Sequence, residues 1–177
     1  NGRSTGKLRK EFHTPAVGDI RKVITSLSGI DEPIKKMMSY RFHTLRDLDG
    51  HAVVNFILTS MLDITWSLKD SIASLSKLLD VRHTVLPISE DSNLTLMGKD
   101  LDGNIIEGEE EITMARRQLE KIYYKEEPKV FPEVLTALKE ADLIIFSMGS
   151  LYTSVLPNVM CKEVKAVLKE AKAPIMY

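Results

Sequence analysis

Hydroxyl side chains follow a glycine directly after an apolar run in the segment from Asp142 to Asn158, DLIIFSMGSLYTSVLPN. A strand that ends in a turn of small residues and continues into a helix presents backbone N–H groups at one point, where nearby hydroxyls can add hydrogen bonds. Such groups bind anions, usually phosphate. The residues concerned are Gly149, Ser150, Thr153 and Ser154. The segment therefore predicts a ligand-binding turn, without indicating a reaction.

A second group with phosphate-binding character opens the chain, with the sequence NGRSTGKLR. Its glycines allow the backbone to approach a ligand closely, its hydroxyls and a helix start offer donors, and its cations add positive charge. The residues are Gly2, Ser4, Thr5, Gly6, Lys7 and Arg9. The GxxxxGK[ST] spacing of a P-loop is absent. A simple turn in which Ser4 or Thr5 caps a short helix explains the same residues.

Asp19 follows Gly18 in a predicted loop and is the candidate metal ligand of the chain. A carboxylate in such a place can hold Mg²⁺ together with a substrate phosphate, because Mg²⁺ usually takes only one or two protein carboxylates. The alternative is that Asp19 caps the helix that follows it.

His51 follows Gly50 at a predicted helix start, and Asn55 lies one turn later. His51 can hydrogen-bond a phosphate or a ribose, and the alternative is a histidine satisfied by the backbone. We find no nucleophile beside a base at catalytic spacing, since the serines fit caps and turns. Catalytic residues therefore stay unassigned.

The apolar pattern predicts the elements that hold these groups in place. Helical spacing indicates helices over residues 20–27, 31–42, 51–65, 67–81 and 132–141. Short apolar runs indicate strands over 85–88, 94–98, 105–106, 122–124 and 174–177, with a hairpin turn at 102–104. Leu143 to Phe146 predict a further strand, buried on both faces. This strand, the helix after Asn158 and the strand 174–177 make a βαβ unit, whose turn lies where α/β sheets bind ligands.

The order of the elements predicts an α/β fold, namely a three-layer, Rossmann-like domain with a mostly parallel sheet. Residues 1–177 form a single domain in this prediction, and residues 83–126 a small β-rich insertion within it. The chain begins inside a Gly/Ser-rich loop and ends inside a predicted strand, so we expect it to be truncated at both ends.

The composition is ordinary for a globular protein, with 44% hydrophobic and 28% charged residues among 177. A net charge of −1 gives no reason to expect nucleic acid as a partner. No apolar run reaches the roughly 20 residues of a membrane span, and the chain shows no signal peptide. Cys161 is the only cysteine, which excludes an internal disulfide and fits a cytoplasmic location. Residues 1–50 carry ten Lys and Arg against six acids, which suits a small anionic ligand or, alternatively, a solvated helix face.

Taken in order, the motifs resemble those of the YvcK/CofD-like family, which includes the gluconeogenesis-factor YvcK proteins and, more distantly, the 2-phospho-L-lactate transferases. The matching runs are NGRSTGKLR, PAVGDIR, the YRF of Tyr40 to Phe42, the GHxxxN of Gly50 to Asn55, and GSLYTSVLPN. The last of these is the most specific. The chain departs from the family's usual residues at Arg3 (usually Gly), Lys22 (Asn), Val54 (Gly) and Met148 (Pro).

The resemblance implies a fold that binds a nucleotide or nucleotide-sugar. The YvcK branch implies a regulatory protein that binds UDP-sugars and supports growth on gluconeogenic carbon, cell-wall synthesis and cell shape. The CofD branch, the alternative, implies transfer of a phospholactyl group with Mg²⁺ held by acids, one of which Asp19 matches. Homo-oligomerisation stays open. With the residues added by the resemblance, the candidate ligand-binding set is Asn1, Gly2, Ser4, Thr5, Gly6, Arg9, Gly18, Asp19, His51, Asn55, Gly149, Ser150, Tyr152, Thr153, Ser154 and Asn158.

Overall fold

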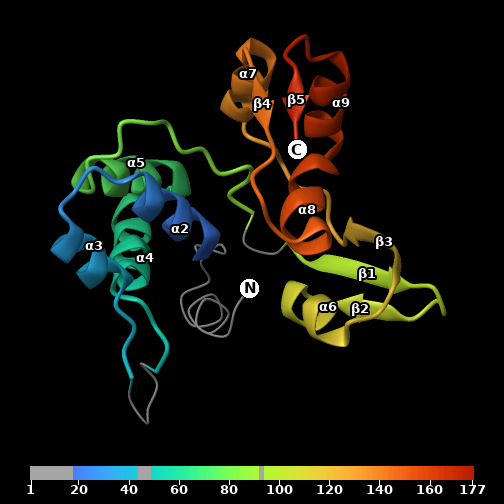
Figure 1. Ribbon diagram of the computed structural model, residues 1–177, viewed down its shortest axis with the longest axis horizontal. Helices are drawn as coiled ribbons and strands as arrows, with labels where there is room; N and C mark the ends of the chain where they lie inside the picture. Colours follow the sequence, from blue (N-terminus) through green and yellow to red (C-terminus); the bar gives the residue numbers. More distant parts are fainter. Residues whose placement is uncertain (1–17, 44–48, 92–93) are drawn as a thin grey trace. The chain divides into compact units, whose positions relative to one another are not determined.

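A computed structural model describes residues 18–43, 49–91 and 94–177 of the chain, and these residues form an α/β structure (Figure 1). The chain divides into two compact units, the first ending at Ser92 and the second beginning at Asn93. The first unit is helical in the part that the structure describes, whereas the second combines helices with two small sheets.

The helices of the first unit begin and end close to the predicted positions. They are α2 (Gly18–Leu27), α3 (Glu32–Ser39), α4 (Val53–Thr65) and α5 (Leu68–Leu78). Asp31 is the N-cap residue of α3, with a proline in the first turn, as predicted. The Ser67 hydroxyl caps α5 by accepting a hydrogen bond from the Asp70 N–H at 3.2 Å. The prediction that Asp19 caps α2 is wrong, because α2 already begins at Gly18 and Asp19 lies within its first turn.

Apolar side chains of all four helices meet in the core of the first unit. The buried members are Ile24, Met38, Ala52, Val54, Leu58, Leu68, Ile72, Leu75 and Leu79. Ile24 and Leu58 are both fully buried, which holds α2 against α4. The core therefore fixes the two helix starts that carry the predicted site residues of this unit.

An isolated backbone bridge closes the loop between α3 and α4. Arg41 pairs with Ala52 in this antiparallel bridge. Within it the Phe42 N–H donates to the His51 carbonyl at 3.0 Å, and the Gly50 N–H to the Phe42 carbonyl at 2.8 Å. These backbone bonds form a fixed neck, in which the two ends of the loop are held together.

The second unit begins with an antiparallel three-stranded sheet. Its strands are β1 (Leu96–Asp100), β2 (Ile105–Glu107) and β3 (Leu119–Tyr124), in the order β2-β1-β3. Gly103, at a φ of +87°, makes the tight turn between β1 and β2, as the hairpin signal predicted. Helix α6 (Glu109–Ala115) packs against β1 and β2 and buries Ile112. The sheet lies inside the segment 83–126 that was predicted to be β-rich.

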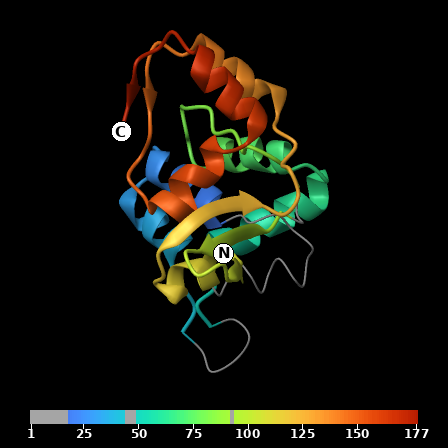
Figure 2. The same ribbon diagram turned by 90° about the vertical axis from the view of Figure 1, so that its right-hand side faces the viewer.

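A βαβ arrangement follows in the same unit. Helix α7 (Pro132–Glu140) leads to β4 (Ile144–Ile145), a π-helical turn η1 (Leu151–Val155), α8 (Leu156–Val159), α9 (Lys162–Glu170) and β5 (Ile175–Met176). Strands β4 and β5 pair in parallel, as predicted. Figure 2 shows α7 and α9 on the same side of this pair, where the two helices pack against each other.

Two predictions about strands are wrong. Residues 85–88 form no strand, because Pro87 lacks a backbone donor, and the segment is half-buried without a ladder partner. The strand at Leu143 to Phe146 is not buried on both faces, since Ile145 is 61% exposed. Ile145 is exposed because α7 and α9 lie on one side only of the strand pair.

The predicted mostly parallel, three-layer sheet is not confirmed by the described residues. The larger sheet is antiparallel, and the parallel pair has two strands.

Candidate functional site

The described residues hold the predicted site residues in two groups, one in each unit. Asn1, Gly2, Ser4, Thr5, Gly6 and Arg9 lie outside the described residues. The first unit holds Gly18, Asp19, His51 and Asn55, and the second unit holds Gly149, Ser150, Tyr152, Thr153, Ser154 and Asn158. Each group belongs to its own unit, and their meeting in one site stays a prediction.

In the second unit the predicted turn lies between β4 and α8 and has an unusual backbone. The N–H groups of Ser154 and Val155 both donate to the Ser150 carbonyl, at 2.8 and 3.1 Å. The second bond spans five residues, which makes η1 a π-helical turn, a form that occurs frequently at functional sites. Amides in the first turn of any helix lack a carbonyl partner further back, so those of η1 are free to meet a ligand.

Gly149 is required by the close packing of this turn. A Cβ added at Gly149 would lie 3.0 Å from the Ser154 Cβ, closer than carbon atoms normally approach. The glycine therefore lets the end of β4 run directly past η1. Gly149, Ser150 and Ser154 are all exposed, so their polar groups face solvent.

The other predicted residues of the turn differ in what they can offer. The Asn158 side-chain amide donates to the Ser154 carbonyl at 2.8 Å and so supports the turn from within. Tyr152 is 39% exposed and Thr153 half-buried. The exposed amides and hydroxyls can together bind an anionic or polyhydroxylated group, whereas no acid or base of this turn is set for catalysis.

In the first unit His51 and Asn55 lie at the start of α4 and are buried. His51 is 3% and Asn55 1% exposed. The His51 ring packs on Phe56 with centroids 5.5 Å apart, and Phe56 meets Phe42 edge to face at 6.2 Å. The aromatic packing holds His51 in place. Its predicted contact with a ligand stays a prediction.

Asn55 carries a polar atom for which the described residues provide no partner. Its Oδ1 is buried and accepts no hydrogen bond from them. Buried amide oxygens are nearly always satisfied, because leaving one unpaired costs about 1–3 kcal/mol. An unpaired Oδ1 is therefore a place where a donor from outside the described residues would be favourable.

Asp19 is held by a neighbouring cation. The Lys22 ammonium lies 3.0 Å from Asp19 Oδ1, and the Lys22 and Asp19 side chains are 67% and 77% exposed respectively. Such an exposed ion pair is weak and leaves the carboxylate accessible. No group of three or more His, Cys, Asp or Glu suited to a metal ion is found among the described residues. Because Mg²⁺ usually takes only one or two protein carboxylates, Asp19 as a metal ligand stays a prediction.

Two arginines in the first unit were missed as candidates by the sequence reasoning. Arg21 lies in the first turn of α2 and is only 8% exposed, and its Nε has no hydrogen-bond partner among the described residues. Burial and the charge of Arg41 lower the pKa of Arg21, against a smaller opposite effect of Asp19. Both arginines stand in the matching runs PAVGDIR and YRF, so the motifs contained the signal.

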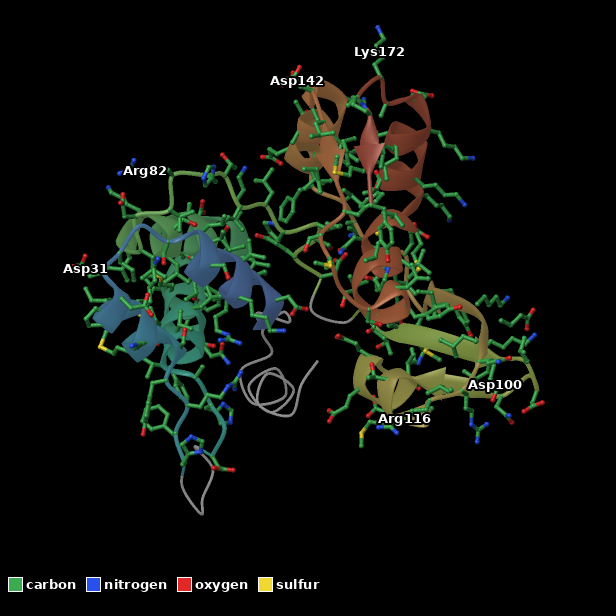
Figure 3. The ribbon with its side chains drawn as sticks, viewed as in Figure 1. Asp31, Arg82, Asp100, Arg116, Asp142 and Lys172 are labelled. Atoms are coloured by element: carbon green, nitrogen blue, oxygen red, sulfur yellow. The ribbon has the colours of Figure 1, made fainter. Side chains whose placement is uncertain are left out.

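Two further ionisable groups have structural roles. Asp100, labelled in Figure 3, is 1% exposed and accepts hydrogen bonds from the Asn104 backbone and from Arg117, both at 2.7 Å. Bonds from the Asn104 side chain and from Arg117 lower the pKa of Asp100 to about 2. Cys161 is 1% exposed, and burial raises its pKa, so it is an inert core thiol. Neither belongs to a reactive constellation.

The described residues form an α/β protein with two groups of polar candidate residues, and a family model shows which family the chain belongs to. The model of the family described as 2-phospho-L-lactate transferase CofD matches residues 1–177. The chain therefore belongs to the CofD family.

Within this family the similar proteins are gluconeogenesis factors. The chain is 37% identical to the gluconeogenesis factor of Listeria monocytogenes and 34% identical to that of Bacillus subtilis, in both cases over its whole length. A crystal structure of the protein BH3568 from Bacillus halodurans superposes with a TM-score of 0.94 at 36% identity, over 99% of this chain and 57% of that one. A second structure of BH3568, described as a member of the UPF0052 family, gives 0.92.

The chain spans about half the length of these relatives, 55% of the Listeria protein and 56% of the Bacillus subtilis protein. Among the described residues, no helix combines the length and the apolar character that crossing a membrane requires.

Proposed function

We propose that this chain binds a nucleotide-sugar of the UDP-sugar type through its phosphate groups and acts as a regulatory binding protein. The observation that carries the proposal is the turn from Gly149 to Asn158. It combines a glycine without room for a side chain, exposed hydroxyls and the leading amides of a π-helical turn. Such a surface offers many donors and little negative charge, which suits phosphate oxygens and sugar hydroxyls.

The wider role follows from the relatives. Proteins named gluconeogenesis factor match the whole chain, and this name supports a link to central carbon metabolism. A role in cell-wall synthesis and cell shape, through UDP-sugars, is the further part of the proposal. The same proposal includes further chain that completes a Rossmann-like, mostly parallel sheet. Part of this further chain would cover the exposed side of β4 and β5.

Binding is favoured over the transferase alternative by what the two polar groups offer. The described residues bring no nucleophile and base together at either of them. The ion pair of Asp19 with Lys22 is exposed and leaves the carboxylate accessible, so the dependence on Mg²⁺ is what separates the two functions.

The test is a thermal-shift titration of the full chain with UDP-N-acetylglucosamine, UDP and uridine, with and without Mg²⁺. We expect UDP-N-acetylglucosamine to raise the Tm, uridine to have little effect, and chromatography to recover the nucleotide-sugar unchanged. Ser150→Ala should weaken binding, while Ser74→Ala, at an exposed serine on α5, serves as the matched control.

Two results would decide against the proposal. Absence of a shift with any nucleotide would remove the binding function. Consumption of a nucleotide only with Mg²⁺, abolished by Asp19→Asn, would establish the transferase instead.

A further inference from the structure

Arg21 is a buried cation that forms no ion pair with the described residues. Its side chain is 8% exposed, and its Nε is buried with no hydrogen-bond partner there. No carboxylate of the described residues forms an ion pair with it. A buried charge is normally paired or hydrogen-bonded, because its desolvation is otherwise uncompensated.

Arg41 adds a second positive charge at the helix against which α2 packs. Its backbone pairs with Ala52 in the bridge at the start of α4, and its Nη1 donates to the Gly50 carbonyl. Its side chain is exposed, and its charge lowers the pKa of Arg21. Like charges that act on each other are stabilised by an anion bound to both.

The surroundings of the two arginines favour an anion. Arg21 belongs to the first turn of α2, a helix of ten residues, and the N-terminal end of a helix carries a partial positive charge that favours anions. The one carboxylate that raises the pKa of Arg21 is that of Asp19, which also pairs with Lys22 at 3.0 Å. Asn55, on the helix that packs against α2, has its own unpaired Oδ1.

We propose that Arg21 and Arg41 bind a phosphate group of the ligand, together with the leading amides of α2. A guanidinium offers several N–H donors in one plane, a geometry that matches the oxygens of a phosphate. The ligand class is a phosphate or diphosphate ester, and Asn55 Oδ1 would accept a hydrogen bond from one of its hydroxyl or N–H groups. The inference deepens the proposed function and rests on it for the identity of the nucleotide, though not for the anion.

An anion-binding Arg21 and a purely structural Arg21 differ in their effect on stability. If Arg21 is placed to bind an anion, its charge is unpaired in the ligand-free protein and destabilises it. Removing the charge should then raise the Tm in the absence of ligand. Arg21→Met keeps the length of the apolar stem and removes the guanidinium. An arginine that stabilises the fold would give the opposite sign.

The experiment compares Arg21→Met, Arg41→Met and Arg82→Met in the full chain. Arg82 lies in the same unit with its side chain 84% exposed, and its nearest acid is Asp80 at 3.9 Å, so it controls for net charge. The probes are inorganic pyrophosphate and UDP-N-acetylglucosamine, followed by calorimetry and thermal unfolding at two salt concentrations. We expect Arg21→Met to lose about tenfold or more in affinity for both probes, and Arg82→Met to bind as the parent does.

Each outcome decides the question. Unchanged affinity of Arg21→Met, an equal loss in Arg82→Met, or a lower Tm with an intact anion response would overturn the inference. If Arg21→Met does not fold, Arg41→Met carries the same expectation for affinity. If the parent chain binds pyrophosphate through Arg21 but binds no nucleotide-sugar, the proposed function alone is refuted. If it binds the nucleotide-sugar and neither arginine variant changes the affinity, this inference alone is refuted. A parent chain that binds neither probe refutes both.

Discussion

Gly149→Ala is the substitution that most directly tests the geometry of the ligand-binding turn. The new Cβ would lie 3.0 Å from the Ser154 Cβ and 3.5 Å from its Oγ. Carbon atoms prefer a separation of about 3.5–4.0 Å, so the backbone of β4 or of η1 must move by a few tenths of an ångström. The φ of Gly149 lies outside the left-handed region, so the strain comes from this contact alone.

The cost should be modest in stability and larger in binding. Overpacking costs about 1–3 kcal/mol in a core, and the exposed position of this turn places the value near the lower end, about 1 kcal/mol. For a chain of this size that corresponds to a fall in Tm of about 2–4 °C. Ligand affinity should fall further, because the displaced amides are those that we propose to contact the ligand.

A compensating variant separates the contact from any general effect. Ser154→Gly removes the Cβ that the added methyl group would meet, at a cost of about 0.5 kcal/mol in helix propensity. If the contact is real, the double variant should be more stable than the sum of the two single changes predicts, by about 1 kcal/mol. Urea unfolding of the four proteins gives this coupling energy.

The result that would refute the reasoning is additivity. Single and double variants whose free energies of unfolding add within about 0.3–0.5 kcal/mol would mean that residues 149 and 154 do not touch. The close approach of β4 to η1, and with it the described shape of the turn, would then be incorrect.

The remaining predictions concern buried or closely packed residues that stabilise the two units. Because bonding holds the pKa of Asp100 at about 2, below its usual 3.8, its stabilising contribution should be complete above about pH 4 and lost as the pH falls towards 2. Asp100→Asn should abolish that part of the pH dependence in urea unfolding between pH 2 and 7, and an unchanged profile would contradict it. Gly29→Ala should cost about 1–3 kcal/mol, because its Cβ would lie 2.9 Å from the Asp80 carbonyl oxygen, and wild-type stability in chemical unfolding would disprove the contact. Cys161 should react with iodoacetamide only after unfolding, and rapid labelling of the native protein would show that the thiol is not buried.

Much of the secondary structure could be predicted because helical periodicity is a strong local signal. The helices of the first unit and α7 carry apolar residues at helical spacing, and the hairpin at Gly103 has its own turn signal. Residues 85–88 show where the signal misleads. Val85 packs beside the helical core and the rest of the run is partly or fully buried, so burial rather than strand pairing explains the pattern.

The arrangement of the strands could not be predicted, since it depends on pairing between distant segments. Ile144 and Ile145 look alike in the sequence, yet one is 7% and the other 61% exposed. Only the placement of α7 and α9 on one side of the pair determines which is buried. An apolar run shows that its residues are hydrophobic, but it does not show which face of the strand other elements will cover.

The candidate site was predictable in position more than in chemistry. The turn at Gly149 was correctly predicted between a strand and a helix, although its π-helical form has no sequence signal. Arg21 was overlooked because an arginine in a helix usually points to solvent. Its burial is a tertiary property, set by how α2 packs on α4.

The fixed neck between α3 and α4 makes this loop a place where the chain can be lengthened. The hydrogen bonds of Phe42 with Gly50 and His51 join its two ends. Loop closure becomes only about 0.6 kcal/mol more costly for each doubling of length, so a short dye-binding peptide inserted there should leave both helices in place. Because Arg41 stands at the neck, such an insertion would put an optical reporter beside the cationic residues without replacing any of them.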